Sequence, residues 1–368
     1  MGSVNRIFPH HFRSIVLFVF CAALLLMVNG CGALHGSSPS TATSTVTASE
    51  LPTSTATQTP TFTPAPTPTA TPPHVICGER PAMFILLIGS DGRGKGYSVG
   101  LADSIRVVRL DFVEPSIQVL AFQRDLYVEI PGIEEHNNIT HGKLSQAYLY
   151  GNPGYRYYDG EGQGPGLMAL TLKYNFGAQV DHYIAVNLQA FLKIVDEIGG
   201  IDINLPYTID GRVKRSTDPN RYFPAGEQHL NGYRTMLLAR LRPQGDFHRA
   251  EVQNLILQAF AEKMLGRSIL EFPELIAKFG DAVQTDLGPV EIGQLLCLRA
   301  RLSKNGVEYL SFPENLFKSD RVHDPVLGNT SIQAADFDVL KIYVRRFNEG
   351  RWHLPPEHIR EEDNPSLP

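Results

Sequence analysis

This sequence has few cysteines and no large excess of either positive or negative charge. Only 4 cysteines occur in 368 residues, and none forms a Cys-x-x-Cys pair or a cluster with histidine, which leaves no ligand pattern for zinc or a redox centre. The net charge is -5 and no basic stripe is present, which argues against nucleic acid as a partner. A Gly-x-Ser-x-Gly elbow is also missing, which disfavours a serine hydrolase.

The N-terminal 31 residues are typical of an export signal. Arg6 and Arg13 precede an apolar run over residues 15–28, and small and polar residues follow Cys31. The run is shorter than the roughly 20 residues that span a bilayer as a helix. Two outcomes stay open: cleavage with lipidation of Cys31, because residues 26–31 resemble a bacterial lipoprotein box, and an uncleaved anchor. Either outcome predicts attachment to the outer, extracytoplasmic face of the cell membrane.

Residues 32–75 are predicted to form a disordered stalk. From about His35 to Pro73 the chain is almost wholly Ser, Thr, Pro and Ala, with Phe62 as its only aromatic residue. Such a segment cannot bury enough apolar surface to fold. At roughly 3.1 Å per residue of polyproline II, it could hold a domain on the order of 100 Å from the membrane.

Residues 76–355 have the mixed composition of a globular domain, and this length can bury one substantial core. Five apolar segments are predicted to be strands: 82–88, 105–110, 117–122, 182–186 and 201–205. Helical patterns cover 144–150, 166–174, 188–198, 232–239, 246–265 and 290–302. The order predicts an α/β layered domain with a central mixed β-sheet flanked by helices on both faces, followed by a solvated tail over 356–368.

Cys77 and Cys297 are the two cysteines that lie beyond the export signal. An exported domain meets an oxidising compartment, which allows a disulfide between them. Such a bond would pin the start of the domain.

The segment 240–253, RLRPQGDFHRAEVQ, is the densest group of residues suited to an anion. Its proline and glycine break the preceding helical pattern, so Asp246 is the expected N-cap of the next helix and Arg249 lies near its third position. A cation there opposes the helix dipole, and such a breach of a local rule indicates a site. The free N–H groups of a helix start and the forks of Arg240, Arg242 and Arg249 favour the same ligand, phosphate.

Gln253 follows Arg249 by one helical turn and shares its face. One alternative stays open from the spacing alone, in which Asp246 and Glu251 neutralise the arginines in an ordinary surface network.

Carboxylates at strand ends form a second candidate site. The first predicted strand ends in the segment 89–93, which contains Asp91 and Arg93, and ligands of α/β sheets gather beyond such carboxyl ends. Asp103, just before the second strand, could return a second carboxylate to the same edge. Two hard oxygen ligands suit Mg²⁺, which fills its remaining positions with water and substrate phosphate. The plainer alternatives are a glycine-rich turn in which Asp91 pairs with Arg93, and an Asp103 that caps a loop.

Two further segments could add charge to the same rim. Arg124 and Asp125 follow the third predicted strand directly. Lys143 opens a short helix, where a solvated surface lysine is the ordinary interpretation.

Taken together and in order, the motifs of this chain resemble the LytR-CpsA-Psr family. The collinear segments are ILLIGSDGR, ADSIRVV, FQRDLYVEIPG, KLSQAY, a Gly-Gly-Ile-Asp turn, AGEQHLNG and RLRPQGDFHRAEVQ. They run from about Phe84 to Leu265, and the C-terminal segment carries none of them. The resemblance implies the family's fold and a membrane-tethered, extracytoplasmic phosphotransferase that moves a glycopolymer from a polyprenyl-pyrophosphate carrier onto peptidoglycan.

The resemblance also implies roles for individual residues. The implied Mg²⁺ ligands are Asp91 and Asp103. The implied pyrophosphate-binding residues, with the cap Asp246 grouped among them, are Arg93, Arg124, Lys143, Arg240, Arg242, Asp246, Arg249 and Gln253. The catalytic set would be Asp91, Asp103, Arg124, Asp125 and Arg249, with Asp91 or Asp125 as proton acceptor. An apolar tunnel for the polyprenyl chain is expected, with walls from 166–174, 188–198 and 252–264.

Some positions depart from the family pattern. Leu101 stands where an arginine is usual two residues before the metal-binding Asp103, which removes one cation from the phosphate site. Gln123 replaces the usual proline, and Val252 and Asn254 stand where a basic residue and a second glutamine are common. Three rivals to the transferase stay open. They are a hydrolase of the same lipid-linked substrate, a partner-binding scaffold on a stalk, and a cell-wall binding lipoprotein without turnover, which Leu101 favours most.

Overall fold

A computed structural model describes the globular part of the chain. The described residues are 74–92, 99–136, 138–212, 217–241, 246–265, 267, 278, 283–303 and 306–353, with the side chains of 246–248 and 265 outside that description.

The centre of the molecule is a six-stranded mixed sheet with the strand order β11-β6-β1-β2-β3-β12. Its members are β1 (Ala82–Ser90), β2 (Ala102–Asp111), β3 (Ser116–Phe122), β6 (His182–Asn187), β11 (Val283–Thr285) and β12 (Val307–Ser311). β1 runs parallel to β6 and β3 runs parallel to β12, whereas β2 and β11 are antiparallel to their neighbours. The carboxyl ends of β1, β3, β6 and β12 therefore meet at one edge, where the amino end of β2 also lies.

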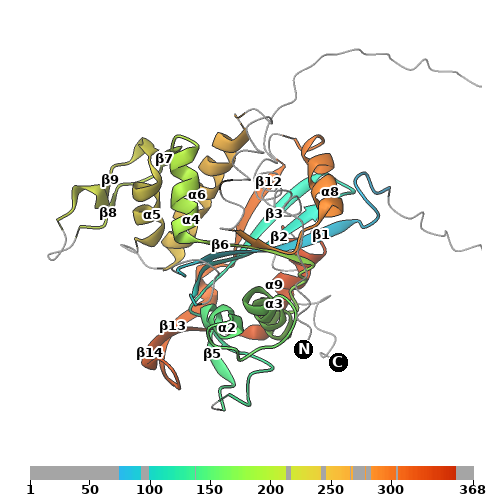
Figure 1. Ribbon diagram of the computed structural model, residues 1–368, viewed down its shortest axis with the longest axis vertical. Coiled ribbons are helices and arrows are strands. Elements are labelled where there is room, and N and C mark those ends of the chain that lie inside the picture. Colours follow the sequence, from blue (N-terminus) through green and yellow to red (C-terminus); the bar gives the residue numbers. More distant parts are fainter. Residues whose placement is uncertain are drawn as a thin grey trace, which may run out of the picture.

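Helices cover both faces of this sheet (Figure 1). One layer holds α4 (Leu188–Glu197), α5 (Gly232–Arg240), α6 (Asp246–Leu265) and α8 (Pro289–Arg299), and the other holds α2 (Leu144–Gly151), α3 (Gln163–Phe176) and α9 (Phe337–Asn348). Alternate strand residues divide between the two layers, because Ile85 and Val108 belong to one core while Leu86 and Val107 belong to the other. The predicted class, an α/β domain with a mixed sheet between helical layers, is confirmed.

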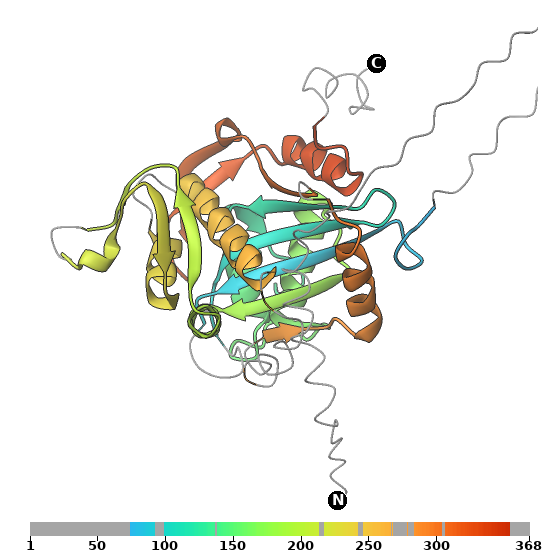
Figure 2. The ribbon, with the colours of Figure 1, turned by 90° about the horizontal axis from the view of Figure 1, so that it is seen from above.

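Shorter strand pairs lie around the central sheet. They are β4 (Tyr127–Glu129) with β5 (His141–Lys143), β7 (Ile201–Leu205) with β10 (Gly226–Leu230), β8 (Ile209–Asp210) with β9 (Tyr222–Phe223), and β13 (Phe317–Asp324) with β14 (Gly328–Ala335). Two 3-10 turns cover Pro219–Arg221 and Glu314–Leu316. In the view from above, α6 crosses over the sheet and the yellow-green β8–β9 segment extends away from it (Figure 2).

Some details differ from the sequence-based expectations. The predicted strand, helix and second strand over 182–205 all occur, but β7 pairs with β10 outside the central sheet. Asp103 lies inside β2 rather than just before it. Both edge strands of the sheet, β11 and β12, come from the C-terminal part of the chain, where no strand is predicted.

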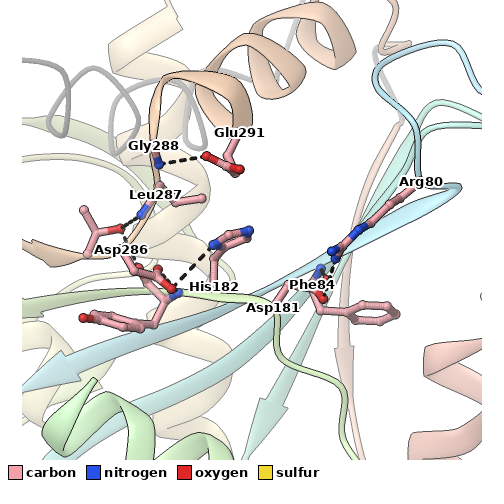
Figure 3. Close-up of polar contacts among 10 residues, drawn as sticks. Arg80, Phe84, Asp181, His182, Asp286, Leu287, Gly288 and Glu291 are labelled. Atoms are coloured by element: carbon pink, nitrogen blue, oxygen red, sulfur yellow. Dashed lines mark hydrogen bonds and ion pairs between the residues drawn. The ribbon is translucent and has the colours of Figure 1, made fainter. Parts of the chain in front are cut away.

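Polar contacts fix the start of β6. This start lies at the end of the sheet away from the carboxyl ends of β1, β3, β6 and β12 (Figure 3). Asp181 accepts a hydrogen bond from Phe84 N at 2.8 Å. Asp286 accepts one from Tyr183 N at 2.8 Å, and its other oxygen lies 3.5 Å from His182 Nδ1. These contacts tie β6 to β1 on one side and to the segment between β11 and α8 on the other.

A disulfide joins Cys77, which precedes β1, to Cys297 on α8, with the Cα atoms 5.7 Å apart. It links segments that are 220 residues apart in the sequence. This is the pairing that the cysteine count allows, and it lies near the start of β1.

Candidate functional site

A cavity of about 480 Å³ lies between the central sheet and the layer of α4 and α6. Charged residues line it where β1 and β3 end, whereas its interior is apolar. The apolar lining includes Leu87, Val119, Val186, Phe191, Ile256 and Leu257. The site is therefore amphipathic, with a charged mouth and an apolar interior.

Asp91 is held at the end of β1 by the main chain of Leu101. Asp91 N donates to Leu101 O at 3.1 Å, and Leu101 N donates to Asp91 Oδ1 at 2.7 Å. Glycines allow this closure, because a Cβ on Gly100 would fall 2.6 Å from Gly92 Cα, and Gly100 has a φ of +154°. Both Asp91 and Leu101 line the cavity. The turn thus presents the Asp91 carboxylate at the mouth with one oxygen already bonded.

Asp103, Arg124, Asp125 and Lys143 form a chain of ion pairs beside the mouth. Arg124 Nη1 contacts Asp103 Oδ1, and Arg124 Nε lies 3.4 Å from Asp125 Oδ1. Lys143 Nζ lies 3.1 Å from the same oxygen, because the β4–β5 pairing sets Lys143 opposite Tyr127. Asp103 and Arg124 line the cavity, but Asp125 and Lys143 do not. The buried Asp125 therefore positions Arg124 and is poorly placed to reach a substrate.

Arg240, Arg249 and Gln253 reach the cavity from α5 and α6. Arg240 is the exposed last residue of α5, and Arg249 lies near the start of α6 with 6% of its surface exposed. Gln253 Nε2 donates to Ala239 O at 3.2 Å, which joins the two helices beside the cavity. α6 begins at Asp246, close to the predicted cap position. The structure thus brings this predicted group to the same cavity as Asp91 and Asp103.

Arg106 on β2 is a cavity residue that sequence analysis missed. It is 2% exposed, and its guanidinium donates to Asn254 Oδ1 at 2.9 and 3.1 Å and contacts Ser104 Oγ and Gln253 Oε1. Burial, which disfavours the charged form, lowers the pKa of Arg106 to about 10, and the nearby charge of Arg249 acts in the same direction. The available signal was a pair of arginines, Arg106 and Arg109, inside the predicted strand 105–110, whose other residues are apolar.

The carboxylates at the mouth fit a magnesium ion. One oxygen of Asp91 is bonded to Leu101 N and one oxygen of Asp103 to Arg124, which leaves Oδ2 of each without a hydrogen-bond partner among the described residues. Two carboxylate oxygens beside room for phosphate match the usual surroundings of Mg²⁺. No group of three or more His, Cys, Asp or Glu side chains is placed to hold a metal in the described part of the chain. An ion here would therefore need water and ligand oxygens to complete its shell.

Several predicted site residues lie outside the described part of the chain. They are Arg93, Arg242, the side chain of Asp246, and Cys31 with the rest of the export signal. Within the residues that the structure describes, no helix is both long and apolar enough to cross a membrane.

One predicted wall of the tunnel is wrong. α4 and α6 line the cavity, but α3, which contains residues 166–174, packs on the other face of the sheet. Its Leu167 and Leu172 share a core with Leu86 and Ile88. The apolar face of α3 suits either side of the sheet, and the chain path decides which side it covers.

Proteins of similar sequence include a regulatory protein and two teichoic acid transferases from bacteria. The chain is 29% identical over 208 residues to the regulatory protein MsrR of Staphylococcus aureus, covering 55% of this chain and 56% of that protein. It is 30% identical over 209 residues to the polyisoprenyl-teichoic acid–peptidoglycan teichoic acid transferase TagU of Bacillus mycoides, covering 55% and 60%. For the Bacillus subtilis transferase TagV the identity is 28% over 217 residues, covering 58% and 52%. The matches thus span between half and three-fifths of the length of these relatives.

Solved structures share the fold. The structure of B. subtilis TagV aligns with a TM-score of 0.55 at 24% identity, covering 76% of this chain and 100% of that one. TagT bound to LIIa-WTA aligns with a TM-score of 0.55 at 19% identity, covering 73% and 91%.

The family model extends beyond the motifs. The LytR_cpsA_psr model matches residues 40–341, so it includes residues 266–341, which carry none of the motifs, and is wider than the expected range of 84–265. With a match over most of its length and the fold of the solved structures, this chain belongs to the LytR_cpsA_psr family.

Proposed function

We propose that this protein transfers a glycopolymer from a polyprenyl-diphosphate carrier to a hydroxyl group of peptidoglycan or another cell-envelope acceptor. The observation that carries the proposal is a single cavity with a cationic mouth and an apolar interior. A diphosphate head suits the arginines, and a polyprenyl chain suits the interior. The names of TagU and TagV as polyisoprenyl-teichoic acid–peptidoglycan teichoic acid transferases support the same class of substrates.

In the proposed reaction, the acceptor hydroxyl oxygen attacks the phosphorus that carries the glycan. A P–O bond to the acceptor forms, the P–O bond to the lipid-side phosphate breaks, and lipid monophosphate leaves. Arg124, Arg240 and Arg249 hold the negative charge of the diphosphate, so that the attacking oxygen is less repelled. Asp91 is the expected proton acceptor because it lines the cavity, whereas Asp125 is paired with Lys143.

The proposed cofactor is Mg²⁺, held by Asp91 and Asp103. When bound, it would supply charge neutralisation at the non-bridging phosphate oxygens. Arg124 pairs with Asp103 and lines the cavity itself, so it positions one proposed ligand and can also contact the phosphate.

The proposed setting is the outer face of the cell membrane. Residues 1–31 would provide the anchor, either lipidated at Cys31 or uncleaved, and residues 32–75 would provide the stalk. Metabolic labelling with a radioactive fatty acid decides between the two anchors. Label that is incorporated into the wild type and lost in Cys31→Ser identifies the lipoprotein, whereas an unlabelled, uncleaved protein identifies the anchor.

The test of function uses the full-length protein in detergent with a polyprenyl-diphosphate glycan. It measures release of lipid monophosphate with and without Mg²⁺ and with and without a peptidoglycan acceptor. We expect release that needs Mg²⁺ and glycan that becomes joined to the acceptor. Arg249→Ala should lower the rate about 100-fold, as loss of one charge-stabilising donor typically does. Lys263→Ala should not, because Lys263 lies on the same helix but pairs with Asp202 outside the cavity.

Two results would contradict the transferase. Release of lipid phosphate and free glycan, with no product on the acceptor, would identify a hydrolase. Tight binding of the lipid-linked glycan without any release would identify a binding lipoprotein.

A further inference from the structure

Arg106 is a buried cation without a carboxylate partner among the described residues. Its guanidinium donates only to neutral groups, which are the side chains of Ser104, Gln253 and Asn254 and the carbonyl oxygen of Ala250 at 3.4 Å. Among the described ionisable side chains that shift the pKa of Arg106, Tyr309 raises it and another arginine, Arg249, lowers it. A buried charge is costly unless an opposite charge compensates it.

Arg109 shows that the same strand can neutralise a buried arginine. It lies three residues further along β2, on the opposite face of the sheet, and is 9% exposed. Its Nη2 atom lies 2.9 Å from Asp111 Oδ2, and its Nε donates to Asn348 O at 3.2 Å. The fold therefore supplies a carboxylate to Arg109 but none, within the described residues, to Arg106. This contrast indicates that the counter-charge of Arg106 comes from a ligand.

The position of Arg106 in the sheet indicates which part of a ligand it would contact. In the sheet register it lies opposite Leu87 on β1 and Ala121 on β3, deeper than the strand ends that carry Asp91 and Arg124. Its guanidinium turns back toward the mouth, where it contacts Ser104 Oγ. Arg106 therefore lies at the boundary between the charged and the apolar parts of the cavity lining.

The charged mouth and the apolar interior favour one orientation of an amphiphile in this cavity. Its apolar chain must occupy the interior, so the phosphate attached to the chain comes to rest deepest, and the group beyond that phosphate points out through the mouth. Arg106 is a cation at this depth, whereas Asp91 and Asp103 lie nearer the outer end.

We infer that Arg106 binds the lipid-side phosphate of the carrier and stabilises the lipid monophosphate as it leaves. The inference rests on the proposed function and adds to it a residue that selects phosphorylated lipids over uncharged ones. When the bond between the two phosphates breaks, the lipid-side phosphate gains negative charge, and a fixed guanidinium beside it lowers the energy of that change.

The test compares farnesyl monophosphate, farnesyl diphosphate and farnesol as probes of the full-length protein in detergent. Isothermal titration calorimetry gives the affinities, and thermal unfolding without ligand gives the stability. The variants are Arg106→Met, which keeps the length of the chain without the charge, and Arg106→Lys, which keeps the charge. Arg109→Met is the matched control, because it removes a buried arginine from the same strand on the face away from the cavity.

We expect Arg106→Met to bind both phosphates at least about tenfold more weakly while farnesol binding is unchanged, since hydrogen bonds to charged groups are worth that much. Arg106→Lys should retain part of the phosphate affinity. Without ligand, Arg106→Met should unfold at the same or a higher temperature than the wild type, because it removes an uncompensated buried charge. Arg109→Met should be less stable but keep the wild-type ratio of phosphate to farnesol affinity.

The opposite pattern would overturn the inference. If Arg106→Met is less stable without ligand and keeps the wild-type ratio of phosphate to farnesol affinity, Arg106 serves only to join β2 to α6. Should Arg106→Met fail to fold, a wild-type affinity ratio in both Arg106→Lys and Arg106→Gln would overturn the inference equally. A wild type that binds none of the phosphates would instead refute the proposed function itself.

Discussion

At the scale of single residues, ion pairs between arginine, lysine and aspartate side chains set the arrangement of charges at the mouth of the cavity. Asp125 lies between Arg124 and Lys143, and neither Asp125 nor Lys143 lines the cavity. Lys143 therefore acts on the site indirectly, by holding the carboxylate that holds Arg124. This differs from the direct contact with pyrophosphate that the family resemblance implies for Lys143, and stability measurements can separate the two roles.

Replacing Lys143 with methionine should lower the free energy of unfolding by about 1–3 kcal/mol, because it leaves the buried Asp125 carboxylate with a weaker partner. The measurement is the midpoint of urea unfolding. Lys193→Met, which removes an exposed lysine from α4, is the control and should change stability by less than about 0.5 kcal/mol. An equally small change for Lys143→Met would mean that the pair with Asp125 contributes little to the fold.

At the scale of elements, the site exists because three strands end or begin at one edge. β2 runs antiparallel to β1 and β3, so its amino end, with Asp103, meets the carboxyl ends that carry Asp91 and Arg124. At the other end of these strands, polar contacts hold β6 in place. There Asp181, which directly precedes β6, accepts a hydrogen bond from Phe84 N of β1, and Asp286 accepts one from Tyr183 N of β6, so β6 is held in register beside β1 (Figure 3).

The His182 contact at this end of the strands should make stability depend on pH. The carboxylate of Asp286 raises the pKa of His182 above its ordinary value of 6.5, although burial of the ring opposes the shift. A group whose pKa is raised by folding stabilises the protein fully below the unfolded value, and the effect is lost as the pH rises through the folded value. The wild type should therefore exceed His182→Gln in Tm by more at about pH 5.5 than at about pH 8.5.

Thermal unfolding at the two pH values checks this prediction. His229→Gln provides the comparison, because His229 pairs with Asp202 at an exposed position where solvent weakens the interaction. A Tm difference for His182→Gln that is the same at both pH values would contradict the assignment.

At the scale of the whole molecule, the disulfide joins the beginning of the domain to its C-terminal part. Cys77 is buried in the core on the α4 and α8 side of the sheet, and Cys297 lies on α8. The bond is near the start of β1, whereas the mouth of the cavity is at its end. Stability and ligand binding should therefore respond differently to its loss.

Replacing Cys297 with serine should lower the free energy of unfolding by about 2–4 kcal/mol, because the bond closes a long loop of the unfolded chain. The affinity of the folded protein for farnesyl diphosphate should stay at the wild-type value. Denaturant unfolding and calorimetric titration measure the two quantities, with dithiothreitol treatment of the wild type as an independent way to break the bond. Weakened binding by the folded variant would show that the disulfide shapes the cavity as well.

The sequence by itself determined most of the described helices, four strands of the central sheet, and which residues belong to the charged groups. Apolar periodicity gave β1, β3, α4 and α6 nearly at their observed bounds, because side chains alternate or repeat with the local backbone geometry. The collinear motifs likewise pointed to the strand ends and to the start of α6. These are local properties, and a single chain segment carries each of them.

Only the tertiary structure decided which surfaces meet. Periodicity shows that α3 has an apolar face but not which side of the sheet it covers, and it cannot show that β11 and β12 return to the edges of the sheet. The burial of Arg106 is invisible in the sequence for the same reason. An arginine in a strand is exposed or buried according to what packs on that face of the sheet. Here α6 covers Arg106, and the α6 residue Asn254 that contacts it lies 148 residues further along the chain.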